Sequence, residues 1–145
     1  MERLQIETGI KKYEIEDENG DLLGVIRIDP KDLNMLVRCE EVEKNVLALI
    51  ESVDKIVETE ELETAEKKVI EIDEKIKEQL NYLFDYDVSS VIFGNRHCLN
   101  TNHGIPFIQR FMDIIIPVVE NVVKKENKES RERISKYTKQ YGKQS

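Results

Sequence analysis

The sequence contains no tryptophan, three prolines, six glycines and few aromatic residues, which make up 6% of its 145 residues. A β-sandwich or barrel needs more turn residues and more aromatic side chains, so this composition favours helices. Two cysteines, Cys39 and Cys98, do not indicate a disulfide framework. The longest uncharged apolar run, Ile114–Val119, is far too short to cross a bilayer, and the first residues do not resemble a signal peptide. We therefore expect a cytosolic protein without a membrane partner.

Charged residues, in contrast, are abundant and unevenly distributed. They make up 36% of the chain, with 30 acidic against 22 basic residues and a net charge of −8. Residues 124–145 hold eight Lys or Arg against three Glu, a net of +5, which leaves −13 on residues 1–123. The acidic body disfavours nucleic acid as a partner of the whole chain. The basic tail either binds RNA, an acidic partner or its own body, or is a solvated terminus.

The first 28 residues have the pattern of β structure. Two apolar stretches, Tyr13–Glu16 and Leu23–Ile28, flank Asn19-Gly20, a dipeptide that predicts a β-hairpin with a type I′ turn. Further upstream, the apolar residues change from even to odd positions. This change of parity predicts a bulge or break within residues 9–12.

Two long helices are predicted to follow, over residues 29–57 and 60–85. Asp29 and Pro30 suit the N-cap and first position of the first helix, and Thr59 suits the cap of the second. Apolar residues recur every seven positions in both helices, which predicts an antiparallel helical hairpin joined by a short acidic turn. The facing stripes consist of Val46 and Val53 in the first helix and of Leu62, Val69 and Ile76 in the second.

The remainder of the body predicts a short helix over residues 88–93, ended by Gly94, and a polar loop over residues 95–104. The next segment, residues 107–123, is the most apolar of the chain. Apolar side chains lie almost all round it, as expected of a buried helix or of one that a partner covers.

The predicted fold class is therefore α+β and mostly helical. The N-terminal β-hairpin of residues 1–28 packs on a bundle that contains the helical hairpin of residues 29–85 and a hydrophobic C-terminal helix. We expect residues 1–123 to form a single domain. Residues 124–145 are expected to form a basic tail that is partly helical or disordered.

Residues capable of catalysis or metal binding are sparse. His97, Cys98 and His103 form the only close group of metal-capable side chains, and distant Cys39 would have to supply a fourth ligand. The same loop lacks the orienting group that a Cys–His nucleophile pair needs, and the glutamates within residues 58–66 fit a solvated face. We predict no metal, no cofactor and no catalytic residues, and therefore a protein that is not an enzyme.

The order of these segments resembles the tail assembly chaperones of long-tailed bacteriophages and prophages of Gram-positive bacteria. A hairpin with Glu-Asp-Glu-Asn-Gly at residues 16–20 leads into the charged helical hairpin, whose residues 71–84 read EIDEKIKEQLNYLF. Residues 88–95 read VSSVIFGN, and the apolar helix is followed by RISKYTKQY at residues 133–141. The resemblance spans nearly the whole chain.

The resemblance implies a non-enzymatic assembly factor in the cytoplasm of the bacterial host. Such chaperones bind the long helical tape measure protein, keep it soluble and recruit tail-tube subunits around it, and a homo-oligomer is a possible form. Phe107, Phe111 and Ile115 are the candidate partner contacts, since they lie at i, i+4 and i+8 of the apolar helix. In this family a ribosomal frameshift often appends a second domain, here expected near Gly142-Lys143.

Two other classes fit the same composition. A small acidic regulatory protein, such as an antitoxin or a nucleic-acid mimic, would also be acidic and helical, although a basic tail would weaken its negative surface. A phage structural completion protein would bind its neighbours permanently and remain in the finished particle.

Overall fold

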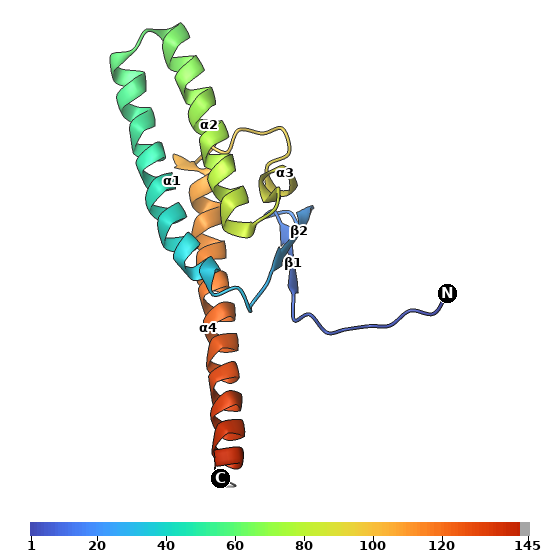
Figure 1. Ribbon diagram of the computed structural model, residues 1–145. Coiled ribbons are helices and arrows are strands. Elements are labelled where there is room, and N and C mark those ends of the chain that lie inside the picture. The colour runs from blue at the N-terminus through green and yellow to red at the C-terminus, as the bar shows by residue number, and fades with distance from the viewer. Residues whose placement is uncertain (143–145) are drawn as a thin grey trace.

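A computed structural model describes residues 1–142, with side chains described through residue 140. The described part of the chain is α+β and mostly helical, which confirms the predicted fold class (Figure 1). Its elements, in chain order, are β1 (Lys11–Glu16), β2 (Leu22–Ile28), α1 (Asn34–Thr59), α2 (Leu62–Phe84), α3 (Val88–Ile92), β3 (Thr101–Asn102), β4 (Ile105–Pro106) and α4 (Phe107–Gly142).

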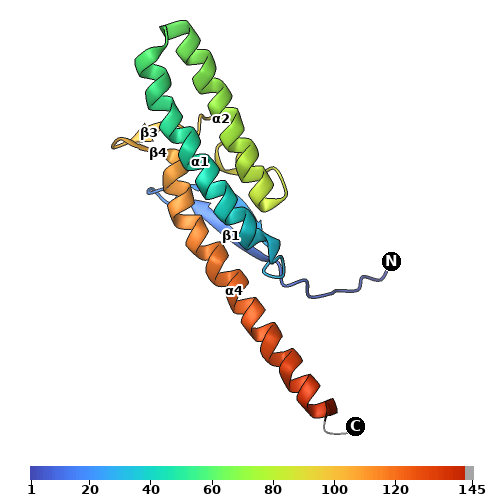
Figure 2. The ribbon, with the colours of Figure 1, turned by 60° about the vertical axis from the view of Figure 1, so that its left-hand side comes forward.

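The helices α1 and α2 form the predicted antiparallel hairpin, and the first half of α4 packs against α1 (Figures 1 and 2). The short helix α3 packs between α2 and the strand β2. One continuous apolar core joins these elements, with Ile28, Val42, Ile76, Leu80 and Val119 fully buried in it.

The hairpin turn differs from the predicted type I′ turn. Gly20 has a φ of 82°, but Asn19 has an ordinary negative φ, and the Gly20 N–H donates to the Asp17 carbonyl at 3.1 Å. A Gly in the left-handed region after an ordinary turn, with a register shift between Ile15 and Glu16, is the geometry of a longer, bulged loop. The Asp17 carboxylate stabilises that loop because it accepts hydrogen bonds from the N–H groups of Asn19 and Asp21.

Residues 1–10 form no strand, which corrects the prediction of β structure over the whole of residues 1–28. They are exposed, and Figure 1 shows them as an extended arm that leads away from the body. Gly9, with a φ of 76°, lies just before β1, where the parity change predicted a break. Alternation alone did not make Leu4 and Ile6 part of a sheet, because no neighbouring strand pairs with this segment.

The β-hairpin is fastened to the helices at two places. At Gly24 a Cβ atom would lie 2.4 Å from Val91 Cγ1 and 3.0 Å from the Val91 carbonyl oxygen, so only glycine permits this approach of β2 to α3. The Arg27 N–H also donates to the Tyr86 hydroxyl at 2.9 Å, and the Arg27 guanidinium lies 4.6 Å from the centre of the Tyr86 ring. Together these contacts hold the apolar face of the hairpin on the core.

The helix caps differ from those predicted. Asp29 accepts from the Lys31 N–H in a separate turn, and the long helix α1 begins only at Asn34. Thr59 is the last residue of α1 and donates its hydroxyl proton to the Lys55 carbonyl, while Glu61 precedes α2. In both cases a short side chain bonds to its local backbone rather than to the start of the predicted helix.

The apolar stripe of α2 is rotated from the predicted row. Leu62 is 76% exposed and Val69 is half-buried, so these two do not form the centre of the seam. The buried row of α2 consists of Ala65, Ile72, Ile76, Leu80 and Leu83. Leu62 is the first residue of α2, at the turn end of the helical hairpin, whereas α3 packs near the other end of α2 and adds to the buried face there (Figure 1).

The helix α4 has two unlike halves. Its first half, through Val123, lies against the body, and Ile108, Ile115 and Val119 are buried there. The helix then continues through residues 124–142 and extends past every other element in both views (Figures 1 and 2). The expected junction at Gly142-Lys143 reaches outside the described residues.

Candidate functional site

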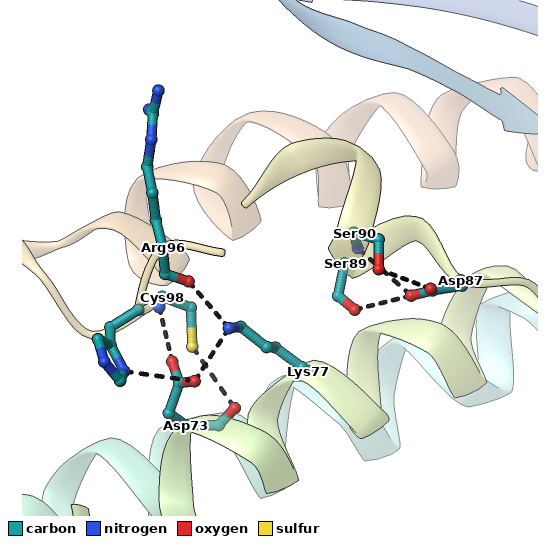
Figure 3. A network of polar contacts seen from close by, with 8 residues as sticks. Asp73, Lys77, Asp87, Ser89, Ser90, Arg96 and Cys98 are labelled. Carbon is teal, nitrogen blue, oxygen red and sulfur yellow. Dashed lines mark hydrogen bonds and ion pairs between the residues drawn. The ribbon is translucent and has the colours of Figure 1, made fainter. Parts of the chain in front are cut away.

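The polar loop after α3 is anchored to α2 through one buried carboxylate, Asp73 (Figure 3). The Cys98 N–H donates to Asp73 Oδ1 at 2.7 Å, and Lys77 Nζ lies 3.0 Å from Asp73 Oδ2. Lys77 also donates to the Arg96 carbonyl at 2.8 Å, and His97 Nδ1 lies 3.6 Å from Asp73 Oδ2. A charge buried in this way is tolerated because its oxygens are paired with a cation and with a backbone donor.

The electrostatics of this cluster disfavour the thiolate form of Cys98. Burial, followed by the hydrogen bond to Asp73, raises the pKa of Cys98 far above its usual range. Burial opposes ionisation of Asp73 too, but hydrogen bonds from Cys98 and Lys77 outweigh it and lower the pKa of that carboxyl. Burial and the nearby charge of Glu120 raise the pKa of Cys39 to about 11. A nucleophilic cysteine needs a lowered pKa, so neither thiol has the electrostatics of one.

His103 has a different local role from His97. It has a φ of 54° and is followed by Gly104 at 78°, so the two residues form the tight turn between β3 and β4. Within residues 1–142, no three His, Cys, Asp or Glu side chains come together as a metal site would require. The Cys98 and Asn100 carbonyls instead accept the N–H groups of Ile108 and Phe107 at the start of α4.

A second polar cluster caps α3. Asp87 accepts from the Ser90 N–H and from the hydroxyls of Ser89 and Ser90, and Asn81 donates to it from α2. Hydrogen bonds from Ser90 and Ser89 lower the pKa of Asp87. The arrangement is that of an N-cap, which explains the Asp-Val-Ser-Ser pattern without any chemistry.

The three candidate partner contacts lie inside the protein's own core. Phe111 and Ile115 are buried, and Phe107 is half-buried against the ring of Phe93 at 5.2 Å between centroids. Phe111 also contacts Phe93 and Phe84 edge-on or tilted. Because these side chains already pack on their own chain, a partner surface has to be sought elsewhere.

The first exposed apolar surface is a groove between α1 and α4, here called the body groove. It has a volume of about 280 Å³. Its apolar lining consists of Val46, Leu47 and Ile50 from α1 and of Met112, Ile116 and Pro117 from α4. Leu47 is 57% exposed at its edge, and Glu43 and Asp113 add negative charge beside it. Such a groove fits the apolar stripe of an amphipathic helix.

The second surface, here called the tip groove, lies near the turn between α1 and α2 and has a volume of about 600 Å³. Its apolar lining consists of Val53, Val57, Leu62, Ala65, Val69, Ile70 and Leu99. Glu60 and Glu66 also line it. Residues 51–68 carry seven acidic side chains against three lysines, and Lys68 pairs with Glu60, so the region around the groove is net negative.

Sequence reasoning overlooked Asp73, although a signal for it was present. Asp73 interrupts the apolar spacing between Val69 and Ile76, where a carboxylate must find partners if the row is buried. The two grooves had no comparable signal, because each depends on how helices distant in the sequence pack together.

Comparison with protein-family models, with curated proteins and with solved structures finds no match for this chain. In the part of the chain that the structure describes, no helix combines the length and the apolar character that a membrane span requires.

Proposed function

We propose that this protein is a non-enzymatic tail assembly chaperone of a long-tailed phage or prophage. It binds the tape measure protein in the host cytoplasm, keeps it soluble and helps to recruit tail-tube subunits. The proposal is supported by the resemblance carried by residues 71–84, 88–95 and 133–141. It is also supported by the helical fold, whose exposed apolar grooves fit a helical client.

The body groove is the observation that carries the proposal. Tape measure helices are long and carry apolar stripes, which aggregate unless another apolar surface covers them. The groove offers the complementary shape, since two helices form its walls and Leu47, Ile50 and Ile116 form its apolar lining. The flanking carboxylates of Glu43 and Asp113 favour client helices with basic side chains beside the stripe.

The experiment is co-expression with the product of the neighbouring long coiled-coil gene. Wild-type protein should keep that product in the soluble fraction and co-purify with it. Leu47→Glu should abolish both effects, because it places a charge at the mouth of the groove. Val37→Glu is the matched control, since Val37 also lies on α1, is also 57% exposed and does not line the groove.

The outcomes separate the proposal from its alternatives. Aggregation of the coiled-coil product whether or not this protein is present contradicts the chaperone function. Recovery of this protein at fixed stoichiometry in purified particles favours a structural completion protein. Specific capture of a DNA-binding or toxin protein, unaffected by Leu47→Glu, favours the acidic regulatory class.

A further inference from the structure

The end of α4 has the chemistry of a docking segment. Residues 128–140 are all exposed, and residues 133–140 carry Arg133, Lys136 and Lys139 without any acidic side chain. Ile134 and Tyr137, more than 60% exposed, lie three residues apart beside Arg133 and Lys136. We call residues 133–140 the basic end. Because short helices in water are marginal by themselves, a helix end of this kind gains stability from a partner surface.

The tip groove has the opposite character. It is apolar at its base through Val57, Leu62 and Ile70, each at least 47% exposed. The chain around it, residues 51–68, has a net charge of −4 from seven carboxylates and three lysines, one of which, Lys68, pairs with the lining residue Glu60. An apolar pair flanked by cations therefore matches an apolar groove that Glu66 lines and that lies in a net negative region.

These two surfaces lie at opposite ends of the molecule. Figure 1 shows the turn between α1 and α2 at one extreme and the end of α4 at the other, and Figure 2 agrees. Residues 124–142 continue α4 as one helix directed away from the body, with a rise of about 1.5 Å per residue. The basic end therefore does not reach the tip groove of its own chain.

We propose that the basic end of one copy docks in the tip groove of a second copy. The interface joins two different surfaces, so every copy can donate one and accept another, and association proceeds head to tail into open chains. Contacts between exposed charges steer and stabilise the docking, so it weakens as salt screens them. This inference goes beyond the proposed function and needs no other protein.

Sedimentation velocity of the purified full-length protein tests the proposal, over a concentration series at about 0.02 M and about 0.5 M salt. We expect species larger than a dimer that grow with concentration at low salt, and monomer at high salt. A basic-end variant, R133E/K136E/K139E, should remain monomeric. A tip variant, E58K/E63K/E66K, should also remain monomeric by itself, and it preserves the Lys68–Glu60 ion pair.

Mixing the two variants gives the sharpest readout. The tip variant keeps its basic end and the basic-end variant keeps its acidic tip, so an equal mixture should regain association at low salt. The matched control R3E/K11E/K12E changes the net charge equally at exposed positions away from both surfaces and should associate like wild type. A monomeric wild type, a mixture that fails to associate, or a control that dissociates to the same extent overturns the proposal.

Discussion

The two halves of α4 belong to one continuous helix but have opposite relations to the rest of the protein. Before Val123 the helix contributes Ile108, Ile115 and Val119 to the core, and beyond residue 127 each side chain through residue 140 is exposed. The first half is apolar almost all round, whereas the second is charged almost all round. The comparison shows that a segment can be helical without packing in the core, since burial of a helix depends on how many apolar side chains it carries.

The same comparison locates the protein's stability and its capacity for interaction in different places. Stability comes from the body, where α4 packs on α1 and the aromatic rings of Phe84, Phe93 and Phe111 meet. The proposed interactions use surfaces that folding leaves exposed, namely the two grooves and the basic end. The predictions below test this division, beginning with the largest expected effect.

The sharpest contrast is the same substitution in each half of α4. Ile115→Asp should lower the free energy of unfolding by roughly 3–5 kcal/mol or prevent folding, because it buries an unpaired charge. Ile134→Asp should change stability by less than about 0.5 kcal/mol, since Ile134 is 62% exposed. Denaturant unfolding monitored by circular dichroism compares the two variants. Equal effects would show that the division of α4 is wrong.

A smaller loss of stability is expected from a substitution where the β-hairpin meets the body. Gly24→Ala should destabilise the protein by about 1–3 kcal/mol, because the added methyl group overlaps Val91. Val91→Ala in the same chain should recover part of that loss, since it removes the nearer of the two overlapping atoms. Denaturant midpoints of the two single variants and the double variant measure the coupling. Additive effects would mean that β2 does not pack on α3 at this point.

Much of the body could be predicted from the sequence because its signals are local. The seven-residue spacing of apolar side chains predicted the helical hairpin, and the stretches around Asn19-Gly20 predicted the β-hairpin. The errors arose where contacts between elements distant in the sequence determine which residues are buried and how a turn is formed. Leu62 lies at the turn end of the helical hairpin and is exposed, and a bulged loop replaces the type I′ turn. Phe111 is equally apolar in a core or at an interface, so the sequence could not decide between the two positions.

The buried carboxylate of Asp73 should contribute about 1 kcal/mol to the free energy of unfolding, and this contribution should depend on pH. Asp73→Asn preserves the shape but removes the charge that pairs with Lys77, so the variant should be less stable near neutral pH by about that amount. The folded protein lowers the pKa of Asp73 below its usual value of 3.8, so on acidification the unfolded chain takes up this proton first. The stabilisation is therefore complete above about pH 5 and is lost as the pH falls through the folded pKa.

The difference between Asp73→Asn and wild type should accordingly shrink as the pH is lowered below about 4. Denaturant unfolding of both proteins at several pH values measures it. Glu74→Gln is the matched control, because Glu74 is exposed on the same helix and forms no ion pair within the described part of the chain. A deficit for Asp73→Asn that stays constant down to the lowest pH would assign its effect to shape rather than charge.

Removal of the exposed end of α4 should have the smallest effect on stability. A chain that ends at Asn127 removes the exposed part of α4 but retains Val119 and Val123 in the core and the Lys124–Glu120 pair. Its free energy of unfolding should change by less than about 0.5 kcal/mol, because residues 128–140 bury little apolar surface. The denaturant slope should also be nearly unchanged, since it follows the surface exposed on unfolding.

The same shortened chain should lose concentration-dependent association, yet still keep the long coiled-coil product soluble through Leu47 and the body groove. A large loss of stability would place the second half of α4 within the fold, and loss of client binding would place the client on the basic end.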